Sequence, residues 1–340
     1  MASSSLNILI VGAGVLGLST AATLRARGHA VAVVDPGGLN ASAVAGGMIA
    51  PAMECALDNP GLQRARLLRT ALDLWPAFAA QTGVELTPAQ AEWRGENWPS
   101  LAACLTAHGF VAEQVAGGVR APDDLRLSPP QALARMARGV EMIRGAVTAV
   151  TRTDDGWRIT LDDGATRDAQ GLILATGAET QISGLPDDAQ AILDRVSPVR
   201  GQIGLVRQPL CDRTIRGPGG YVTPVDDGVL IGATMEAGRR DLAPEAATSQ
   251  RLLRMAETLL GRAIDPADVE WRVGLRGNSP DDQPMAGRAA PGLAVALAPR
   301  RNGWLIGPLI GAVVADAVEG RAPRAEAAAF DPLRFSPPAG

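Results

Sequence analysis

The chain has 340 residues, which is long for a single core and predicts two domains. Of these residues 46% are hydrophobic and 20% charged, a composition typical of a globular protein. Its net charge of −4 offers no basic surface for nucleic acid, and no apolar run approaches the roughly 18 to 20 residues of a membrane span. The three cysteines form no Cys-x-x-Cys pair, only two histidines occur, and lysine is absent, which excludes a disulfide framework, a zinc site, a histidine triad and Schiff-base chemistry. With no signal-peptide pattern in MASSSLN, we expect a cytoplasmic protein without a metal.

A glycine-rich turn near the N-terminus predicts a site for a dinucleotide. Residues 6–11 form a nearly continuous apolar strand, as required for a strand buried on both faces of a parallel sheet. The strand leads into Gly-Ala-Gly-Val-Leu-Gly. In this turn Gly12 permits the tight bend, Gly14 lets the backbone approach a pyrophosphate, and Gly17 lets the next helix pack on the strand.

The segments after this turn complete a βαβ unit. A helix that directs its first N–H groups at the phosphates ends at Gly28, and the next strand, residues 30–34, ends at Asp35, where an acid accepts hydrogen bonds from a ribose. The alternative is a plain βαβ unit whose glycines serve only packing. Residues 36–60 are rich in Gly, Ala and Ser, which lets backbone approach a flat ligand; a flexible surface loop is the alternative.

Further along, the pattern predicts helices and then a β-meander. Residues 62–80 form an amphipathic pattern that ends at Gly83, residues 84–127 are irregular, and a short helix is expected from Pro129 to about Arg138. Strands expected at 142–151, 157–161 and 171–175, joined by Asp-Asp-Gly turns, make the meander.

The last strand of this meander leads into Ala-Thr-Gly, where small side chains at Thr176 and Gly177 allow the close approach of a cofactor. From residue 196 the pattern alternates with period two, which predicts an antiparallel sheet, and a helix is expected at 246–260. A final apolar helix follows the sequence RRNG, so the chain leaves the first domain and returns to it.

These motifs resemble those of the D-amino-acid oxidase family of flavoenzymes, and within it most closely those of the glycine oxidases associated with thiamine biosynthesis. The stretches that carry the likeness are GAGVLGLSTAATLRARGHAVAVVD, AGGMIAP, LILATGA with PVRGQ, YVTP to IGATM, and GLRGNSPDDQPMAG through RRNGWLIGP to FDPLRF. They span nearly the whole chain in the family's order. Only residues 84–140 are shorter and poorly matched.

The resemblance implies an α/β fold, with a Rossmann-like FAD-binding domain and an inserted, mainly antiparallel β (α+β) substrate domain. We expect the FAD-binding domain to comprise residues 1–83, 133–195 and 273–340, and the substrate domain to comprise 84–132 and 196–272.

The resemblance also implies noncovalently bound FAD. The glycine turn would hold the pyrophosphate and Asp35 the ribose, Val147 matches a position beside the adenine, and the segments around 42–48 and 302–305 would lie along the flavin. The expected cofactor-binding residues are Gly12, Gly14, Val15, Gly17, Asp35, Ser42, Gly47, Met48, Val147, Thr176, Gly177, Asn302, Gly303, Trp304 and Leu305.

For the substrate, the family's arginine in GLRP matches Arg276, whose planar guanidinium suits bidentate binding of a carboxylate. Tyr221, the only tyrosine in the chain, matches the tyrosine that supports the same carboxylate, and Arg301 matches a second arginine near the site. Gly277 replaces the family's proline, and Pro299 stands where relatives often have a histidine.

The implied activity is oxidative deamination of glycine or another small (D-)amino acid. In it a hydride passes from Cα to flavin N5, giving an imino acid and, with molecular oxygen, hydrogen peroxide. One alternative is a D-amino-acid or secondary-amine dehydrogenase that uses another electron acceptor; another is a flavin-binding subunit with little turnover. The expected partners are a small amino acid or amine and molecular oxygen, and no nucleic acid. We expect no membrane span, and the sequence is compatible with a homo-oligomer.

Overall fold

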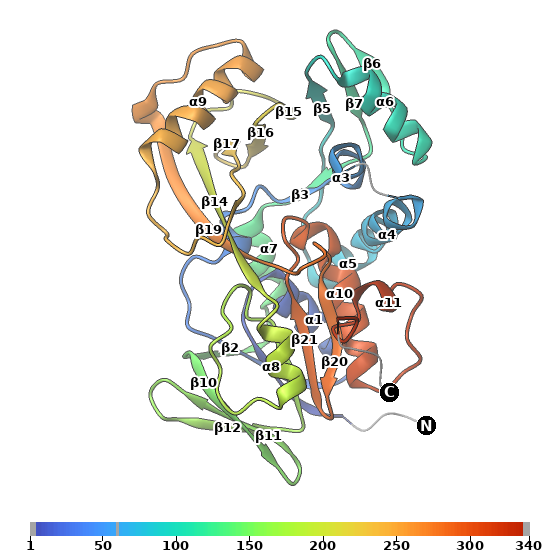
Figure 1. The fold of residues 1–340 in the computed structure, drawn as a ribbon, viewed down its shortest axis with the longest axis vertical. Coiled ribbons are helices and arrows are strands. Elements are labelled where there is room, and N and C mark those ends of the chain that lie inside the picture. The colour runs from blue at the N-terminus through green and yellow to red at the C-terminus, as the bar shows by residue number, and fades with distance from the viewer. Residues whose placement is uncertain (1–4, 59–60, 336–340) are drawn as a thin grey trace.

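A six-stranded sheet forms the centre of the lower half of the molecule in the computed structural model, which describes residues 5–58 and 61–335 (Figure 1). The strand order is β20-β21-β13-β1-β2-β9, and all neighbours are parallel except the edge strand β20. The strands are β1 (Asn7–Val11), β2 (Ala30–Asp35), β9 (Glu141–Arg144), β13 (Gly171–Leu174), β20 (Met285–Ala290) and β21 (Leu293–Leu297).

Both faces of this sheet are buried, which explains the continuous apolar run of β1. Ile8 and Ile10 pack with helices α1 (Val15–Ala26) and α10 (Gly303–Val318). Leu9 and Val11 point the other way, toward a second apolar cluster. That cluster includes α8 (Asp187–Leu193) and the antiparallel strands β10 (Val147–Thr153), β11 (Gly156–Leu161) and β12 (Thr166–Ala169).

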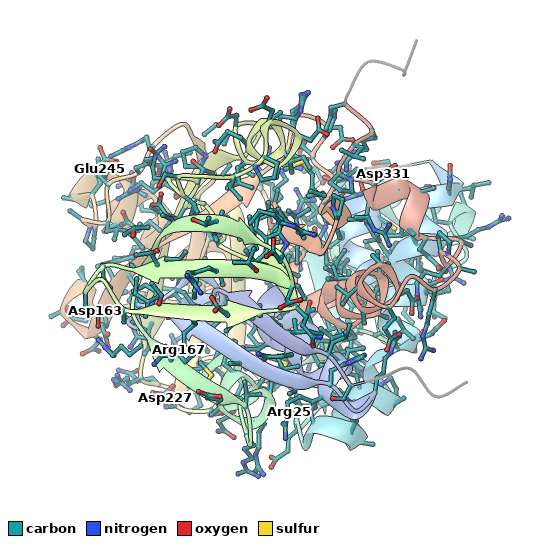
Figure 2. All side chains as sticks on the ribbon, turned by 90° about the horizontal axis from the view of Figure 1, so that it is seen from below. Arg25, Asp163, Arg167, Asp227, Glu245 and Asp331 are labelled. Atoms are coloured by element: carbon teal, nitrogen blue, oxygen red, sulfur yellow. The ribbon has the colours of Figure 1, made fainter. Side chains whose placement is uncertain are left out.

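Figure 2 looks onto this three-stranded sheet from below, with Asp163 labelled in the turn between β11 and β12 and Arg167 labelled on β12.

A nine-stranded sheet occupies the upper half of the molecule (Figure 1). Its order is β18-β14-β17-β16-β15-β5-β7-β6, with β19 paired to β14, and every pairing is antiparallel except that of β5 with β15. The strands are β5 (Ala91–Arg94), β6 (Glu113–Val115), β7 (Gly118–Ala121), β14 (Ser197–Val206), β15 (Thr214–Gly217), β16 (Gly220–Val225), β17 (Gly228–Gly232), β18 (Glu236–Ala237) and β19 (Val269–Asn278). The long strands β14 and β19 extend from this sheet toward the lower half and carry site residues to the junction of the two.

The remaining elements connect the two sheets. A small sheet has the order β3-β8-β4. Its strands are β3 (Met48–Ile49), β4 (Thr87–Pro88) and β8 (Leu125–Arg126). The helices not yet named are α2 (Ala41–Val44), α3 (Pro51–Asp58), α4 (Leu62–Asp73), α5 (Trp75–Thr82), α6 (Trp98–Ala107), α7 (Pro129–Met136), α9 (Ala246–Leu260), the 3₁₀ helix Pro266–Asp268 and α11 (Ala327–Phe330). Among the described residues, no helix is both long and apolar enough to cross a membrane.

The predicted fold class is confirmed: a Rossmann-like parallel sheet is combined with an inserted, mainly antiparallel sheet. The division into domains stays a prediction. Strand β19 runs without a break through the boundary expected between residues 272 and 273, because all ten of its residues pair with β14.

Three details of the sequence prediction were wrong. The helix expected at 62–80 is divided at Leu74, since Pro76 has no N–H to bond the carbonyl one turn earlier. Residues 84–127 are not irregular but contain α6 and the short strands β4 to β8. The meander expected at 142–175 consists of β10, β11 and β12, whereas β9 and β13 belong to the parallel sheet.

Candidate functional site

The glycine turn after β1 leaves no space for side chains at two of its three glycines. Gly12 has φ +108°, and a Cβ there would lie 2.3 Å from the carbonyl oxygen of Ala175. A Cβ on Gly17 would lie 2.0 Å from the Gly12 oxygen, so this glycine sets the approach of α1 to β1. A Cβ on Gly14 would meet only the Ser42 hydroxyl, at 3.3 Å. The turn is thus closed toward the protein and open at Gly14.

Asp35 is fixed beside the same turn at the end of β2. One carboxylate oxygen accepts the Ala13 N–H at 2.7 Å, and the other accepts the Gly37 N–H at 2.7 Å. The Asp35 carbonyl accepts the N–H of Gly145 at 3.2 Å, which brings the start of β10, with buried Val147, to this edge of the sheet. Asp35 and Val147 therefore lie next to the turn.

A small cavity of about 90 Å³ begins at the N-terminus of α1. Ser42 closes one side, since its hydroxyl accepts the Val15 N–H at 3.0 Å and its carbonyl accepts the indole N–H of Trp304 at 3.1 Å. The expected cofactor residues that line this cavity are Gly14, Val15, Ser42, Gly177, Gly303 and Trp304. Thr176 is not among them, because its hydroxyl donates to the Glu179 carbonyl in a local turn.

A larger cavity of about 330 Å³ adjoins the small one, and the two share Ala41, Ala45, Arg276, Arg301 and Trp304 in their walls. Of the expected site residues, the larger cavity brings together Gly47, Met48, Tyr221, Arg276, Arg301, Asn302, Trp304 and Leu305. Gly12, Gly17, Asp35, Val147 and Thr176 line neither cavity. The two cavities make a path from the glycine turn to Tyr221.

Arg276, on β19, presents its guanidinium to the larger cavity. It donates to the Thr234 carbonyl at 3.1 Å and forms no ion pair with any carboxylate of the described residues. Burial lowers its pKa from the ordinary value, but a guanidinium remains charged at neutral pH. Burial also raises the pKa of Tyr221, so its hydroxyl is protonated. The cavity therefore contains a positive charge without a protein counterion, next to a hydroxyl donor.

The sequence model of the family described as FAD dependent oxidoreductase (DAO) matches residues 7–317. The chain belongs to this family. It is an FAD-dependent enzyme. Glycine oxidase of Geobacillus kaustophilus (strain HTA426) is 30% identical over 376 residues, which span 97% of this chain and 96% of that protein.

A solved structure and a second curated relative extend this comparison. The crystal structure of glycine oxidase from Geobacillus kaustophilus matches with a TM-score of 0.82 and 25% identity, and covers 98% of this chain and 100% of that one. The bifunctional protein MnmC of Chromohalobacter salexigens, named for tRNA 5-methylaminomethyl-2-thiouridine biosynthesis, is 30% identical over 88% of this chain. The chain spans about half of that relative, 46% of its length.

The larger cavity also contains two charged residues that were not predicted from the sequence, Glu54 and Arg216. The Glu54 carboxylate accepts Nη1 of Arg216 at 3.1 Å and Nε of Arg301 at 2.5 Å, and Arg301 also donates to Asp58 at 2.6 Å. Burial raises the pKa of Glu54, but Arg216 and Arg301 outweigh it and hold the pKa below its ordinary value of 4.5. Arg301 is thus shared between two carboxylates, unlike Arg276.

The sheet register places Arg216 at the site. Arg216 lies opposite Trp93 of β5 on one side and opposite Tyr221 of β16 on the other, so the three side chains form a cross-strand row along the cavity wall. The guanidinium carbon lies 5.9 Å from the centre of the Tyr221 ring. The alternation of the strand Thr-Ile-Arg-Gly is the only sequence signal for this residue, and it cannot show which strands flank it.

Asp124 is a buried carboxyl group near Arg216, with 2% of its surface exposed. Neither of its carboxylate oxygens has a hydrogen bond of normal geometry among the described residues. Burial raises its pKa to about 8, although the charge of Arg216 and a weaker contact with the Ala52 amide lower it in part. Since the ordinary value is 3.8, the folded protein holds one more proton than the unfolded chain between these pH values, and stability falls as pH rises through this range.

Asp124→Asn is therefore expected to stabilise the protein at pH 7.5 by a few kcal/mol, because the neutral amide can be buried without the proton that folding adds to Asp124. The gain should vanish below about pH 3, where Asp124 is protonated in the unfolded chain as well as in the folded protein. Urea unfolding from about pH 3 to 8 measures it, with Asp123→Asn at the exposed neighbouring position as the control. If the difference in free energy of unfolding between wild type and Asp124→Asn is the same at every pH in this range, the raised pKa of Asp124 is wrong.

Proposed function

We propose that this enzyme oxidises glycine or another small amino acid that carries a free carboxylate, with FAD as the electron acceptor and oxygen as the final oxidant. The observation that carries the proposal is the unpaired guanidinium of Arg276 beside the Tyr221 hydroxyl, in a cavity that adjoins the glycine turn. The glycine oxidase relative supports the substrate class.

The groups around the two cavities suit FAD. The open backbone at Gly14 and the N-terminus of α1 suit a pyrophosphate, and Asp35 suits the ribose next to it. The start of α10, at Asn302 to Leu305, faces the larger cavity and would stabilise negative charge at the pyrimidine edge of a flavin. We propose all the expected cofactor residues as its binding set, with Gly12, Gly17 and Thr176 shaping the backbone rather than touching the cavity.

When bound, FAD supplies the two-electron acceptor that the protein side chains lack. Arg276 binds the substrate carboxylate through two parallel hydrogen bonds, and Tyr221 donates a third. These contacts fix the amino acid so that its Cα–H bond can break, while the lone pair of the neutral amine forms the C=N bond of the imino acid. Arg301, neutralised by Glu54 and Asp58, is the second arginine of the site and holds α3 against the start of α10.

The test is an anaerobic screen of flavin bleaching with glycine, sarcosine and a series of D-amino acids. Bleaching by amino acids, but not by amines of equal size without a carboxylate, supports the proposal. Readmission of air then separates the two acceptors, because an oxidase forms hydrogen peroxide whereas a dehydrogenase reduces only an added dye. No bleaching with any of these compounds overturns the proposal. The cytoplasmic location and the oligomeric state stay predictions.

A further inference from the structure

The loop that connects β17 to α9, residues 233–245, contains the two-residue strand β18 and is hydrogen-bonded to strand β14 at its first residues. Thr234 and Gln202 exchange two hydrogen bonds: the Thr234 N–H donates to the Gln202 carbonyl at 3.2 Å, and the Gln202 N–H donates to the Thr234 hydroxyl at 2.9 Å. Both residues are buried. The position of the Thr234 backbone is therefore set by β14.

The far end of the loop is fastened to the same strand. The Gln202 side chain accepts the Glu245 N–H at 2.8 Å and donates to the Ser249 hydroxyl at 2.7 Å. Arg200, which has no exposed surface, donates to the Asp241 carbonyl at 2.9 Å and to the Glu236 carboxylate at 2.9 Å. Buried groups that are all satisfied in this way make the loop rigid.

One hydrogen bond joins this loop to Arg276. The Thr234 carbonyl accepts Nη1 of Arg276 at 3.1 Å, and no other hydrogen bond of that guanidinium occurs among the described residues. The neighbours of Thr234 on both sides, Ala233 and Met235, line the larger cavity. The loop thus binds one nitrogen of the Arg276 guanidinium.

Gly201, between the two fastening residues, faces the other way. Alternate residues of a strand point to opposite sides, so Arg200 and Gln202 reach the loop while position 201, which pairs with Gly274, faces the guanidinium of Arg276. A Cβ on Gly201 would lie 2.5 Å from Nη2 and 2.7 Å from Cζ of Arg276. In the sequence Arg-Gly-Gln, the first and third residues therefore hydrogen-bond the loop, and the glycine between them leaves space for the guanidinium of Arg276.

We propose that Thr234 and Gly201 are positioning residues for Arg276, Thr234 by orienting the guanidinium through its carbonyl and Gly201 by leaving the space that the guanidinium occupies. This inference rests on the proposed function, in which Arg276 binds the substrate carboxylate. Neither residue touches the reacting atoms. Their effect is on the affinity for the carboxylate.

A matched pair at Thr234 tests the first role. Thr234→Val keeps the shape but removes the hydroxyl that accepts the Gln202 N–H, whereas Thr234→Ser retains it. We expect the valine variant to bind the amino acid about three- to tenfold more weakly, the effect of one hydrogen bond, with its limiting rate of flavin reduction and FAD content unchanged. The serine variant should match wild type. A valine variant that equals the serine variant in affinity overturns the role of Thr234.

A second pair tests Gly201. Gly201→Ala forces only the end of a flexible side chain to move, so the protein should fold, and we expect affinity to fall about a hundredfold because the guanidinium is displaced. Gly204→Ala, on the same strand, collides with Val269 and Trp271 instead and is the control for a packing defect. It should lower the melting temperature without changing affinity. Equal affinities in the two alanine variants contradict the proposal.

Acetate binding separates the failure of this inference from failure of the proposed function. Acetate carries only the carboxylate, and its binding perturbs the visible spectrum of bound FAD without turnover. If wild type neither responds to acetate nor is reduced by amino acids, the proposed function is wrong. If wild type does both and the Thr234→Val and Gly201→Ala variants bind acetate as tightly as wild type, only the positioning roles are wrong.

Discussion

Arg276→Ala is expected to weaken the binding of amino acid substrates by about a hundredfold to a few thousandfold, or roughly 3 to 5 kcal/mol. The alanine removes two charge-assisted hydrogen bonds and leaves the substrate carboxylate without its positive partner in a half-buried cavity. Because Arg276 has no ion pair with a carboxylate of the described chain, its loss should cost little folding stability. The measurement is anaerobic flavin reduction against substrate concentration.

Arg276→Lys serves as the graded control, since an ammonium keeps the charge but not the planar pair of donors, and it should recover only part of the affinity. FAD content and the visible spectrum should be unchanged in both variants. An amine without a carboxylate should react equally with wild type and Arg276→Ala. If the alanine variant keeps full affinity for amino acids, Arg276 is outside the site and Arg301 becomes the candidate, although two carboxylates already neutralise it.

The N-terminal unit was predictable because its determinants are local. The apolar strand, the glycine turn, the helix ending at Gly28 and the strand ending at Asp35 occupy one continuous stretch, and their geometry follows from steric rules that act over a few residues. The positions that must be glycine, Gly12 and Gly17, are those where a Cβ would meet backbone. Such steric requirements can be recognised in a sequence without knowledge of the fold.

The charged part of the site was not predictable for the opposite reason. Glu54 meets Arg216 across 162 residues of sequence and Arg301 across 247, so no local pattern connects them. Glu54 belongs to α3, in a segment that the composition marks only as rich in small residues. The strands of residues 84–127 were not predicted because they are only two to four residues long. In addition, β5 and β8 pair with β15 and β3, which lie outside this segment, although β6 and β7 form a local hairpin.

Glu54→Gln is expected to lower the free energy of unfolding by about 3 to 5 kcal/mol at neutral pH, the usual effect of breaking a buried ion pair from one side. Arg216, which is 5% exposed, loses its only carboxylate partner among the described residues, whereas Arg301 keeps Asp58. The folded pKa of Glu54 lies below its ordinary value of 4.5, so its contribution is present above that pH and is lost as pH falls through the folded value. Wild type and variant should therefore converge in acid.

Urea unfolding between pH 3 and 7 measures this difference, with Glu85→Gln as the control. Glu85 pairs with Arg135 at 3.1 Å, but its side chain is 76% exposed, so its loss should change stability by less than about 1 kcal/mol. Arg216→Met should cost as much as Glu54→Gln, and the double variant less than the sum, because the second change removes a charge that the first left unpaired. Additive losses, or a Glu54→Gln deficit as large at pH 3 as at pH 7, would show that Glu54 stabilises the wall of the cavity by packing alone.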